Sequence, residues 1–177
     1  EVYGATTGNG VTVSSTKVSS SDITAVYYNG ETEIPTNAGI YVITIDVAET
    51  ANYNSASKLE VGSFVIDQAV LSAPVVNEEN LVYSEGMKLS AVPFTAETKA
   101  GWGWTDATQA VQAGENVFEA TYTGADAANY TDASKKANVV FTLGKATLKD
   151  IDFEVTQEEE VYGATTGNGV TVSSTKV

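Results

Sequence analysis

The chain of 177 residues contains no cysteine, no histidine and no arginine, and it has only three prolines and one methionine. The absence of cysteine excludes disulfides and thiolate nucleophiles, and the absence of histidine excludes imidazole bases and a common zinc ligand. A serine triad of the ordinary kind is excluded for the same reason. Only carboxylates, lysines, tyrosines and hydroxyls remain for chemistry, so we expect no enzyme, no cofactor and no resident metal.

Positive charge is scarce as well. The nine basic residues are all lysine, they face 23 acidic residues, and the formal net charge is −14. Such a chain has few groups that could replace the counterions of a phosphate backbone, which argues against a nucleic-acid partner. No apolar run approaches the roughly 20 residues that span a bilayer, so we expect no membrane span in this fragment. We expect any targeting signal to lie outside it.

Two-residue alternation is the strongest local pattern. Ile151, Phe153 and Val155 alternate with acidic residues, which predicts a strand over 148–155 with one buried face and one wet face. Further short apolar segments, separated by Gly and Asn turn residues, cover residues 11–13, 23–28, 41–47, 64–66, 118–122 and 139–143. The polar segments 106–112 and 132–137 suit single helical turns. We therefore predict an all-β fold.

Internal repeats organise the chain. Residues 1–18 recur without change at 160–177, an offset of 159 residues. A shift of 77 residues aligns Asn52-Tyr53 with Asn129-Tyr130 and Phe64 with Phe141. This periodicity predicts two homologous domains in tandem within a longer array, of which the chain is a window. The predicted parts are domain A at 1–68, lacking its first strand, domain B at 69–144, and the first strands of the next domain A at 145–177.

Several motifs resemble a known family. Val2-Tyr3-Gly4, Ala38-Gly39-Ile40-Tyr41 and Asn52-Tyr53, followed by Phe64-Val65-Ile66, resemble the YDG-type and MBG-type repeats of bacterial cell-surface proteins. Domain B is similar to a relative found beside them, through Gly101–Asp106 and Phe118–Tyr122. The pattern departs at Tyr83-Ser84, where the usual Gly is missing. The resemblance implies a secreted β-rich module of an extracellular stalk or adhesin, commonly without assigned chemistry.

For the fold of each domain we predict a small antiparallel β-sandwich of the Ig-like type, with a β-grasp-like domain as the alternative. Each of two sites has both a structural and a binding interpretation. Trp102 and Trp104 would face the same side of a strand and could form a platform for sugar rings, or they could fill the core or an inter-domain contact. The segment Gly124–Asn129 offers calcium only two side chains, so a calcium site is not favoured.

The repeated Asn-Tyr pairs favour a structural role. In each pair we expect the Asn side chain to close the turn and the Tyr hydroxyl to bond a backbone group.

The leading function is therefore a structural repeat of an extracellular surface stalk, adhesin or filament. The alternative is a carbohydrate- or host-ligand-binding module that uses Trp102 and Trp104. The expected partners are adjacent copies of the same repeat, joined covalently or head to tail, besides glycans or a host surface for the binding alternative. The duplicated ends predict strand complementation, in which the strand carrying Ile151, Phe153 and Val155 completes the open edge of domain A in another copy.

Overall fold

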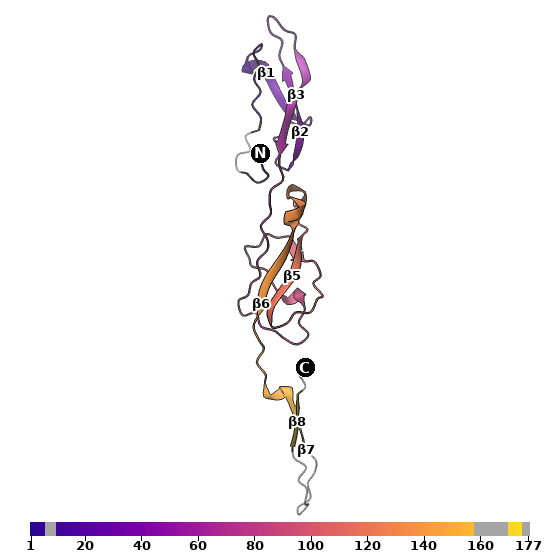
Figure 1. Ribbon diagram of the computed structural model, residues 1–177. Coiled ribbons are helices and arrows are strands. Elements are labelled where there is room, and N and C mark those ends of the chain that lie inside the picture. The colour runs from indigo at the N-terminus through magenta and orange to yellow at the C-terminus, as the bar shows by residue number, and fades with distance from the viewer. Residues whose placement is uncertain (6–9, 158–169, 175–177) are drawn as a thin grey trace, which may run out of the picture. The chain divides into compact units, whose positions relative to one another are not determined.

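The computed structural model describes residues 1–5, 10–157 and 170–174 (Figure 1). Within these residues the regular structure consists of β-strands and short 3₁₀ turns, with no α-helix, and the strands form three small antiparallel sheets. The all-β prediction is confirmed. In the described ranges, no helix is long and apolar enough to cross a membrane.

The described chain divides into two compact units. The first comprises residues 1–74, 98–103 and 120–137, and the second comprises residues 75–97, 104–119 and the described residues from 138 onward. Each unit is described below by its own contacts.

The first sheet has the strand order β1-β2-β3, formed by β1 (Ile23–Tyr28), β2 (Gly39–Val47) and β3 (Ala56–Ile66). The alternation predicted from the sequence sets its two faces, because successive residues of a strand point to opposite sides. One face buries a cluster of Tyr28, Ile43, Phe64 and Ile66, while Ile40 on the other face is exposed. Tyr28 lies opposite Ile43, and Tyr41 lies opposite Phe64.

The first sheet also contains an irregular end held by one carboxylate. Asp46 accepts hydrogen bonds from the Tyr27 hydroxyl at 2.7 Å, the Ser57 hydroxyl at 2.9 Å and the Lys58 backbone N–H at 2.8 Å. Lys58 has a φ of +52°, a left-handed conformation that is uncommon for a residue with a side chain. The three bonds tie β1, β2 and β3 together where the pairing of β2 with β3 is shifted.

The second sheet has the order β4-β5-β6, formed by β4 (Trp102–Trp104), β5 (Gly114–Tyr122) and β6 (Lys136–Leu143). Its buried positions alternate along the strands as predicted, with Val139, Phe141 and Leu143 buried on β6. Short 3₁₀ turns occupy Leu89–Ala91, Ala127–Asn129 and Asp132–Lys135.

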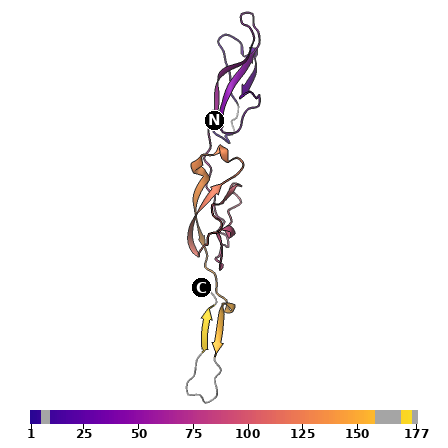
Figure 2. The same cartoon turned by 90° about the vertical axis from the view of Figure 1, so that its right-hand side faces the viewer.

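The third sheet pairs β7 (Phe153–Gln157) with β8 (Val170–Ser174) in antiparallel fashion (Figure 2). The predicted strand over 148–155 is wrong in its first half, because Asp150–Asp152 form a 3₁₀ turn. The Lys149 N–H donates to the Asp152 carboxylate at 2.9 Å, and the Asp152 N–H donates back to the Lys149 carbonyl at 3.0 Å. Ile151 therefore lies in this turn rather than in the strand that holds Phe153 and Val155.

Candidate functional site

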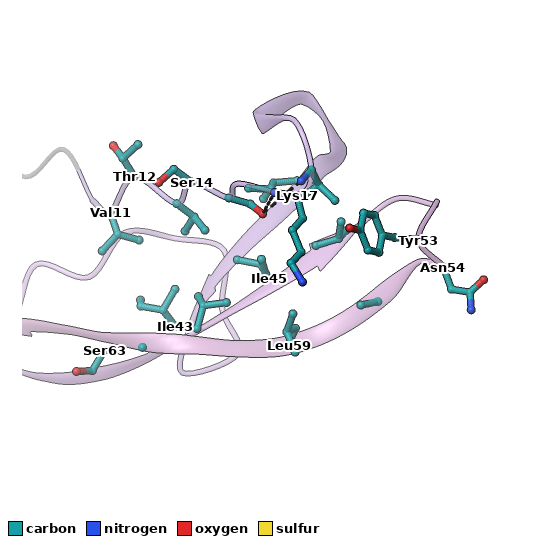
Figure 3. Close-up of a pocket in the computed structure, with 18 residues that line it drawn as sticks. Val11, Thr12, Ser14, Lys17, Ile43, Ile45, Tyr53, Asn54, Leu59 and Ser63 are labelled. Carbon is teal, nitrogen blue, oxygen red and sulfur yellow. Dashed lines mark hydrogen bonds between the residues drawn. The ribbon is translucent and has the colours of Figure 1, made fainter. Parts of the chain in front are cut away.

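An apolar groove lies on one face of the first sheet, beneath residues 11–18 (Figure 3). Its cavity volume is about 640 Å³. Ile43 and Ile45 of β2 and Leu59 of β3 point into it, and the Lys17 side chain enters from the opposite side. The two isoleucines are buried, but Leu59 is 51% exposed, so the groove is open along β3.

Residues 11–15 face the sheet across the groove, and their side chains point alternately toward the sheet and toward solvent. Val11 and Val13 are half-buried and pack against the core cluster of the first sheet, whereas Thr12 and Ser14 are exposed. The Val11 N–H donates to the Tyr28 hydroxyl at 2.9 Å. Among the described residues, the backbone groups from Thr12 to Ser15 have no hydrogen-bond partner. A strand that entered the groove could therefore pair with them.

Gly10 fixes where this segment begins. Its φ is +66°, and a Cβ atom there would collide with the Tyr28 hydroxyl and crowd Ile34. Glycine is the residue that accepts such a backbone conformation and such a close approach without strain. The Tyr28 hydroxyl is thereby free to reach the Val11 N–H.

Phe153 and Val155, two of the three predicted strand-donation residues, are exposed on β7. Phe153 and Val155 of β7 are 41% and 67% exposed, and Val172 of β8, which pairs directly with Val155, is also exposed. Directly opposed residues of an antiparallel pair project from the same face, so Val155 and Val172 form a continuous apolar surface. Among the described residues, no second layer covers this surface.

A second cluster in the first unit centres on Asp126. Its carboxylate accepts hydrogen bonds from the Tyr122 hydroxyl at 2.6 Å and the Tyr3 hydroxyl at 3.3 Å, and it pairs with Lys99 at 3.1 Å. The Tyr130 hydroxyl lies 3.5 Å away. The Tyr122 hydrogen bond, followed by the Lys99 hydrogen bond, lowers the pKa of Asp126 to about 2.

Two of the groups that contact Asp126, Lys99 and Tyr122, have raised pKa values. The hydrogen bond to Asp126 raises the pKa of Lys99, and burial, followed by the hydrogen bond to Asp126, raises the pKa of Tyr122. General acid–base catalysis works best with a group whose pKa lies near the operating pH. These shifts move Asp126, Lys99 and Tyr122 away from such a pKa, so the cluster suits cross-linking of segments rather than proton transfer.

The Asn129 side chain forms a third contact in the first unit. Asn129 is 5% exposed; its Oδ1 accepts from the Ala38 N–H at 2.8 Å, and its Nδ2 donates to Asn37 Oδ1 at 3.0 Å. The prediction that this Asn closes its own turn is wrong. The prediction of a backbone partner for the Tyr130 hydroxyl is also wrong, because that hydroxyl reaches the Asp126 carboxylate.

The two side chains weighed as calcium ligands are thus engaged elsewhere. Asp126 holds the tyrosine hydroxyls and Lys99, and Asn129 holds residues 37 and 38. In the ranges that the structure describes, no group of three or more acidic side chains converges as a metal site would require.

The earlier Asn-Tyr pair behaves differently from the later one. Asn52 and Tyr53 are both exposed. The turn there is closed by Thr50, whose N–H donates to the Tyr53 carbonyl and whose hydroxyl accepts from the Tyr53 N–H. The two Asn-Tyr pairs therefore share their sequence but make different contacts.

The two tryptophans are half-buried among aromatic residues. The Trp104 ring centroid lies 4.6 Å from that of Phe94 and 5.6 Å from that of Phe141, and its Nε1–H donates to the Val92 carbonyl at 2.9 Å. Trp102 contacts Tyr122, with ring centroids 5.7 Å apart. Its buried Nε1–H finds no acceptor among the described residues. These contacts favour the packing interpretation, while a role in ligand binding stays a prediction.

No protein-family model, curated protein or solved structure matches this chain. Sequence reasoning missed the Asp126 cluster and the Asn129 contact. The spacing of Tyr122, Asp126 and Tyr130 by four residues was a signal for the first, but Tyr3 is 123 residues away from Asp126 and no local pattern points to it.

Proposed function

We propose that this chain is a structural repeat module of an extracellular bacterial surface stalk, adhesin or filament. In this proposal it consists of tandem Ig-like β-sandwich domains of the YDG-type and MBG-type, with boundaries at 1–68, 69–144 and 145–177. Its function is to carry load and to extend reach, and its partners are adjacent copies of the same repeat. The observation that carries the proposal is a parallel bridge that closes both predicted domains in the same way.

In the first predicted domain the bridge joins Val2 to Asp67. The Tyr3 N–H donates to the Asp67 carbonyl at 2.9 Å, and the Asp67 N–H donates to the Glu1 carbonyl at 2.7 Å. These bonds connect an early segment of the domain to Asp67, the residue that follows its last strand, β3.

In the second predicted domain the bridge joins Val82 to Gly144. The Tyr83 N–H donates to the Gly144 carbonyl at 2.9 Å, and the Gly144 N–H donates to the Leu81 carbonyl at 3.0 Å. A Val-Tyr dipeptide thus makes the bridge in both domains. The acceptor positions, Asp67 and Gly144, are 77 residues apart, which is the period of the internal repeat.

The parallel direction of these bridges suits a module under tension. Force along the chain pulls an early and a late segment of a domain in opposite directions. When the two segments run parallel, their hydrogen bonds are sheared together rather than opened one after another. Each bond has a net value of only about 0.5–1.5 kcal/mol, so joint loading determines how well the pair resists force.

Hydrogen bonds also cross the predicted boundary between residues 68 and 69. The Gln68 side chain donates to the Ala128 carbonyl at 2.9 Å, and the Ala69 N–H donates to the Asn129 carbonyl at 2.9 Å. The Thr131 N–H donates back to the Ala69 carbonyl at 3.0 Å. Together with the contact of Asn129 to residues 37 and 38, these bonds support a stiff junction, as a stalk requires.

Single-molecule extension tests the proposal. Pulled by its two ends, the chain is expected to lengthen in discrete steps, each releasing roughly 65–75 residues and therefore roughly 215–270 Å of contour length. Gradual extension at low force, without such steps, would contradict a load-bearing module.

A glycan-binding screen addresses the alternative. We expect no glycan whose binding depends on the tryptophans, and the Trp104→Ala variant is expected to lose about 3–5 kcal/mol of stability, as Trp→Ala changes do when the ring is packed. Saturable glycan binding that Trp102→Ala abolishes without a change in melting temperature would favour the binding module instead.

A further inference from the structure

We propose that Tyr3 and Tyr130 form a site of oxidative modification, at which a one-electron oxidant joins the two rings through a carbon–carbon bond as dityrosine. The inference goes beyond the proposed function, because it assigns a covalent reaction to two residues whatever the chain does as a module. The reactant is an oxidant of the peroxide class, activated by a peroxidase. The product ties residues 1–5 covalently to the segment that holds Tyr130.

The composition directs oxidants to aromatic residues. Sulfur side chains are common targets of oxidation in proteins, yet this chain has no cysteine and only one methionine. It has nine tyrosines and two tryptophans. Phenol and indole rings are the next side chains to lose an electron, so a one-electron oxidant that meets this chain reacts mainly with them.

Tyr3 and Tyr130 are held against each other. Their ring centroids lie 5.5 Å apart with the ring planes at 87°, an edge-to-face contact that aromatic pairs favour. Both hydroxyls donate to the same atom, Asp126 Oδ2, at 3.3 Å from Tyr3 and 3.5 Å from Tyr130. Dityrosine forms between the ring carbons next to the hydroxyl groups, and a shared acceptor brings those carbons together.

A row of aromatic rings connects the buried Tyr130 to half-buried ones. Tyr130 is 9% exposed, so an oxidant in solution acts on it mainly through its neighbours. The half-buried Trp102 lies 5.7 Å from Tyr122, and Tyr122 lies 5.8 Å from Tyr130, measured between ring centroids. An electron lost by Trp102 is therefore replaced from the tyrosines behind it. Tyr3, half-buried at the other end of the row, is oxidised directly.

Asp126 is placed to accept the protons that the oxidised tyrosines release. The Tyr122 hydroxyl and Lys99 hold its pKa low, so it is ionised at neutral pH. The low pKa does not prevent the transfer, because a phenol that has lost an electron is a far stronger acid than a carboxylic acid. The buried Trp102 Nε1–H, by contrast, finds no acceptor within the described ranges. The electron deficiency therefore settles on the tyrosines, whose protons have an acceptor.

The reaction balances with one molecule of hydrogen peroxide. Each ring loses one electron and its hydroxyl proton, which leaves two neutral tyrosyl radicals. The radicals couple at the carbons next to the oxygens, and the hydrogens on those two carbons move to the oxygens and restore the phenols. The peroxide takes up the two electrons and two protons and becomes two molecules of water.

Peptide mapping after oxidation tests the site. Dilute protein is treated with hydrogen peroxide and a peroxidase and is then cut after lysine with trypsin. Tyr3 is the only tyrosine of peptide 1–17, and Tyr130 lies in peptide 100–135. We expect mass spectrometry to find these two peptides joined with the loss of two hydrogen atoms, and fragmentation to place the bond on Tyr130.

The chain carries a matched internal control. Tyr162 lies in residues 160–177, which repeat the sequence of residues 1–18, and trypsin places it in peptide 150–176. If local sequence alone decided reactivity, both peptides would join peptide 100–135 equally. We expect the link to 1–17 to exceed the link to 150–176 by about tenfold, because a held pair reacts at a high effective concentration. Equal yields would overturn the inference.

Single substitutions separate the pair from its surroundings. Tyr130→Phe keeps the ring and removes the phenol, so it should abolish the link to peptide 1–17. Tyr53→Phe, at a site 45% exposed, is the matched control and should leave the yield unchanged. Asp126→Asn keeps an oxygen acceptor but no longer takes up a proton, so the yield should fall by about tenfold or more, as is usual when a positioned base is lost. Circular dichroism verifies that each variant keeps the parent fold.

Several outcomes contradict the modification site. They are dityrosine that forms only at other tyrosines, a link that persists in Tyr130→Phe, and an undiminished yield in a folded Asp126→Asn. A mixture of isotope-labelled and unlabelled chains adds a further test, because linked peptides that combine the two labels would show a bond between chains instead of within one. Failure of this reaction leaves the discrete extension steps of the proposed function intact, and absence of those steps leaves the reaction untouched.

Discussion

Asp126 connects parts of the chain that are far apart in sequence. Its carboxylate accepts from Tyr3 and Tyr122 and pairs with Lys99. A charged carboxylate is a stronger hydrogen-bond acceptor than a neutral carboxyl group, so all three contacts depend on the ionised form. The cluster should therefore hold Tyr3, and with it the early segment of the first unit, only while Asp126 is charged.

Acidification should weaken this cluster. The folded-state pKa of about 2 lies below the ordinary value of about 4, so the stabilisation is fully present above about pH 4 and is lost as the pH falls toward 2. In Asp126→Asn, the melting temperature should start lower and fall less between pH 5 and pH 2. Tyr122→Phe, which removes the largest cause of the shift, should show an intermediate slope. Parallel melting curves of parent and Asp126→Asn would contradict the assignment.

Asn129 offers a second test at the residue scale. Asn129→Ala removes the acceptor of the half-buried Ala38 N–H and the buried Asn129 amide, and it should lower the free energy of unfolding by about 1–3 kcal/mol, as is usual when a polar group shielded from water loses its partner. Denaturant unfolding measures the change. Asn52→Ala, at the exposed repeat position, is the matched control and should stay within about 0.5 kcal/mol of the parent. Equal losses in the two variants would show that the Asn129 contact contributes nothing specific.

At the scale of the elements, the alternation of apolar and polar residues predicted the strands. A side-chain hydrogen bond that caps a turn decided where one of them begins. The segments 23–28, 41–47, 118–122 and 139–143 lie in β1, β2, β5 and β6 because their apolar residues alternate and one sheet face is buried. Asp150 and Asp152 extend that alternation in the sequence, yet the Asp152 carboxylate caps a 3₁₀ turn instead. A capping carboxylate and a solvent-facing one look alike in sequence.

The groove and the two residue clusters could not be predicted in the same way. The Asn129 contact joins residues 91 positions apart, and the walls of the groove come from residues 11–18, β2 and β3. Such sites depend on how the elements pack.

Asp46 should control the irregular end of the first sheet. Its hydrogen bond from the Lys58 N–H, followed by those from Tyr27 and Ser57, lowers its pKa, so the ionised form is the one that holds the strands. In Asp46→Ala we expect the Lys58 amide to exchange with deuterium about tenfold faster, since its acceptor is gone and the left-handed conformation loses support. Glu60→Ala, an exposed change on the same strand, should leave that rate unchanged. A Lys58 amide that remains protected in Asp46→Ala would show that another acceptor holds the strand end.

At the scale of the whole molecule, the net charge and the two parallel bridges both agree with the proposed stalk module. A net charge of −14 makes copies of the chain repel one another in solution. Two predicted domains close by the same parallel bridge, although one uses Val2-Tyr3-Gly4 and the other Val82-Tyr83-Ser84. The missing glycine noted in the sequence therefore does not prevent the bridge, since the contact is made through the backbone of the Val-Tyr pair.

The central claim is that these bridges bear load, and removal of one bridging N–H tests it most directly. Tyr3→Pro removes the donor to the Asp67 carbonyl, while Tyr3→Ala keeps that donor and loses only the side chain. Pulled by its ends, the Tyr3→Pro chain should show one unfolding step at a clearly lower force than in Tyr3→Ala, with the other step unchanged. The pair Tyr83→Pro and Tyr83→Ala should affect the other step instead. Equal rupture forces in the proline and alanine variants at both positions would contradict the account.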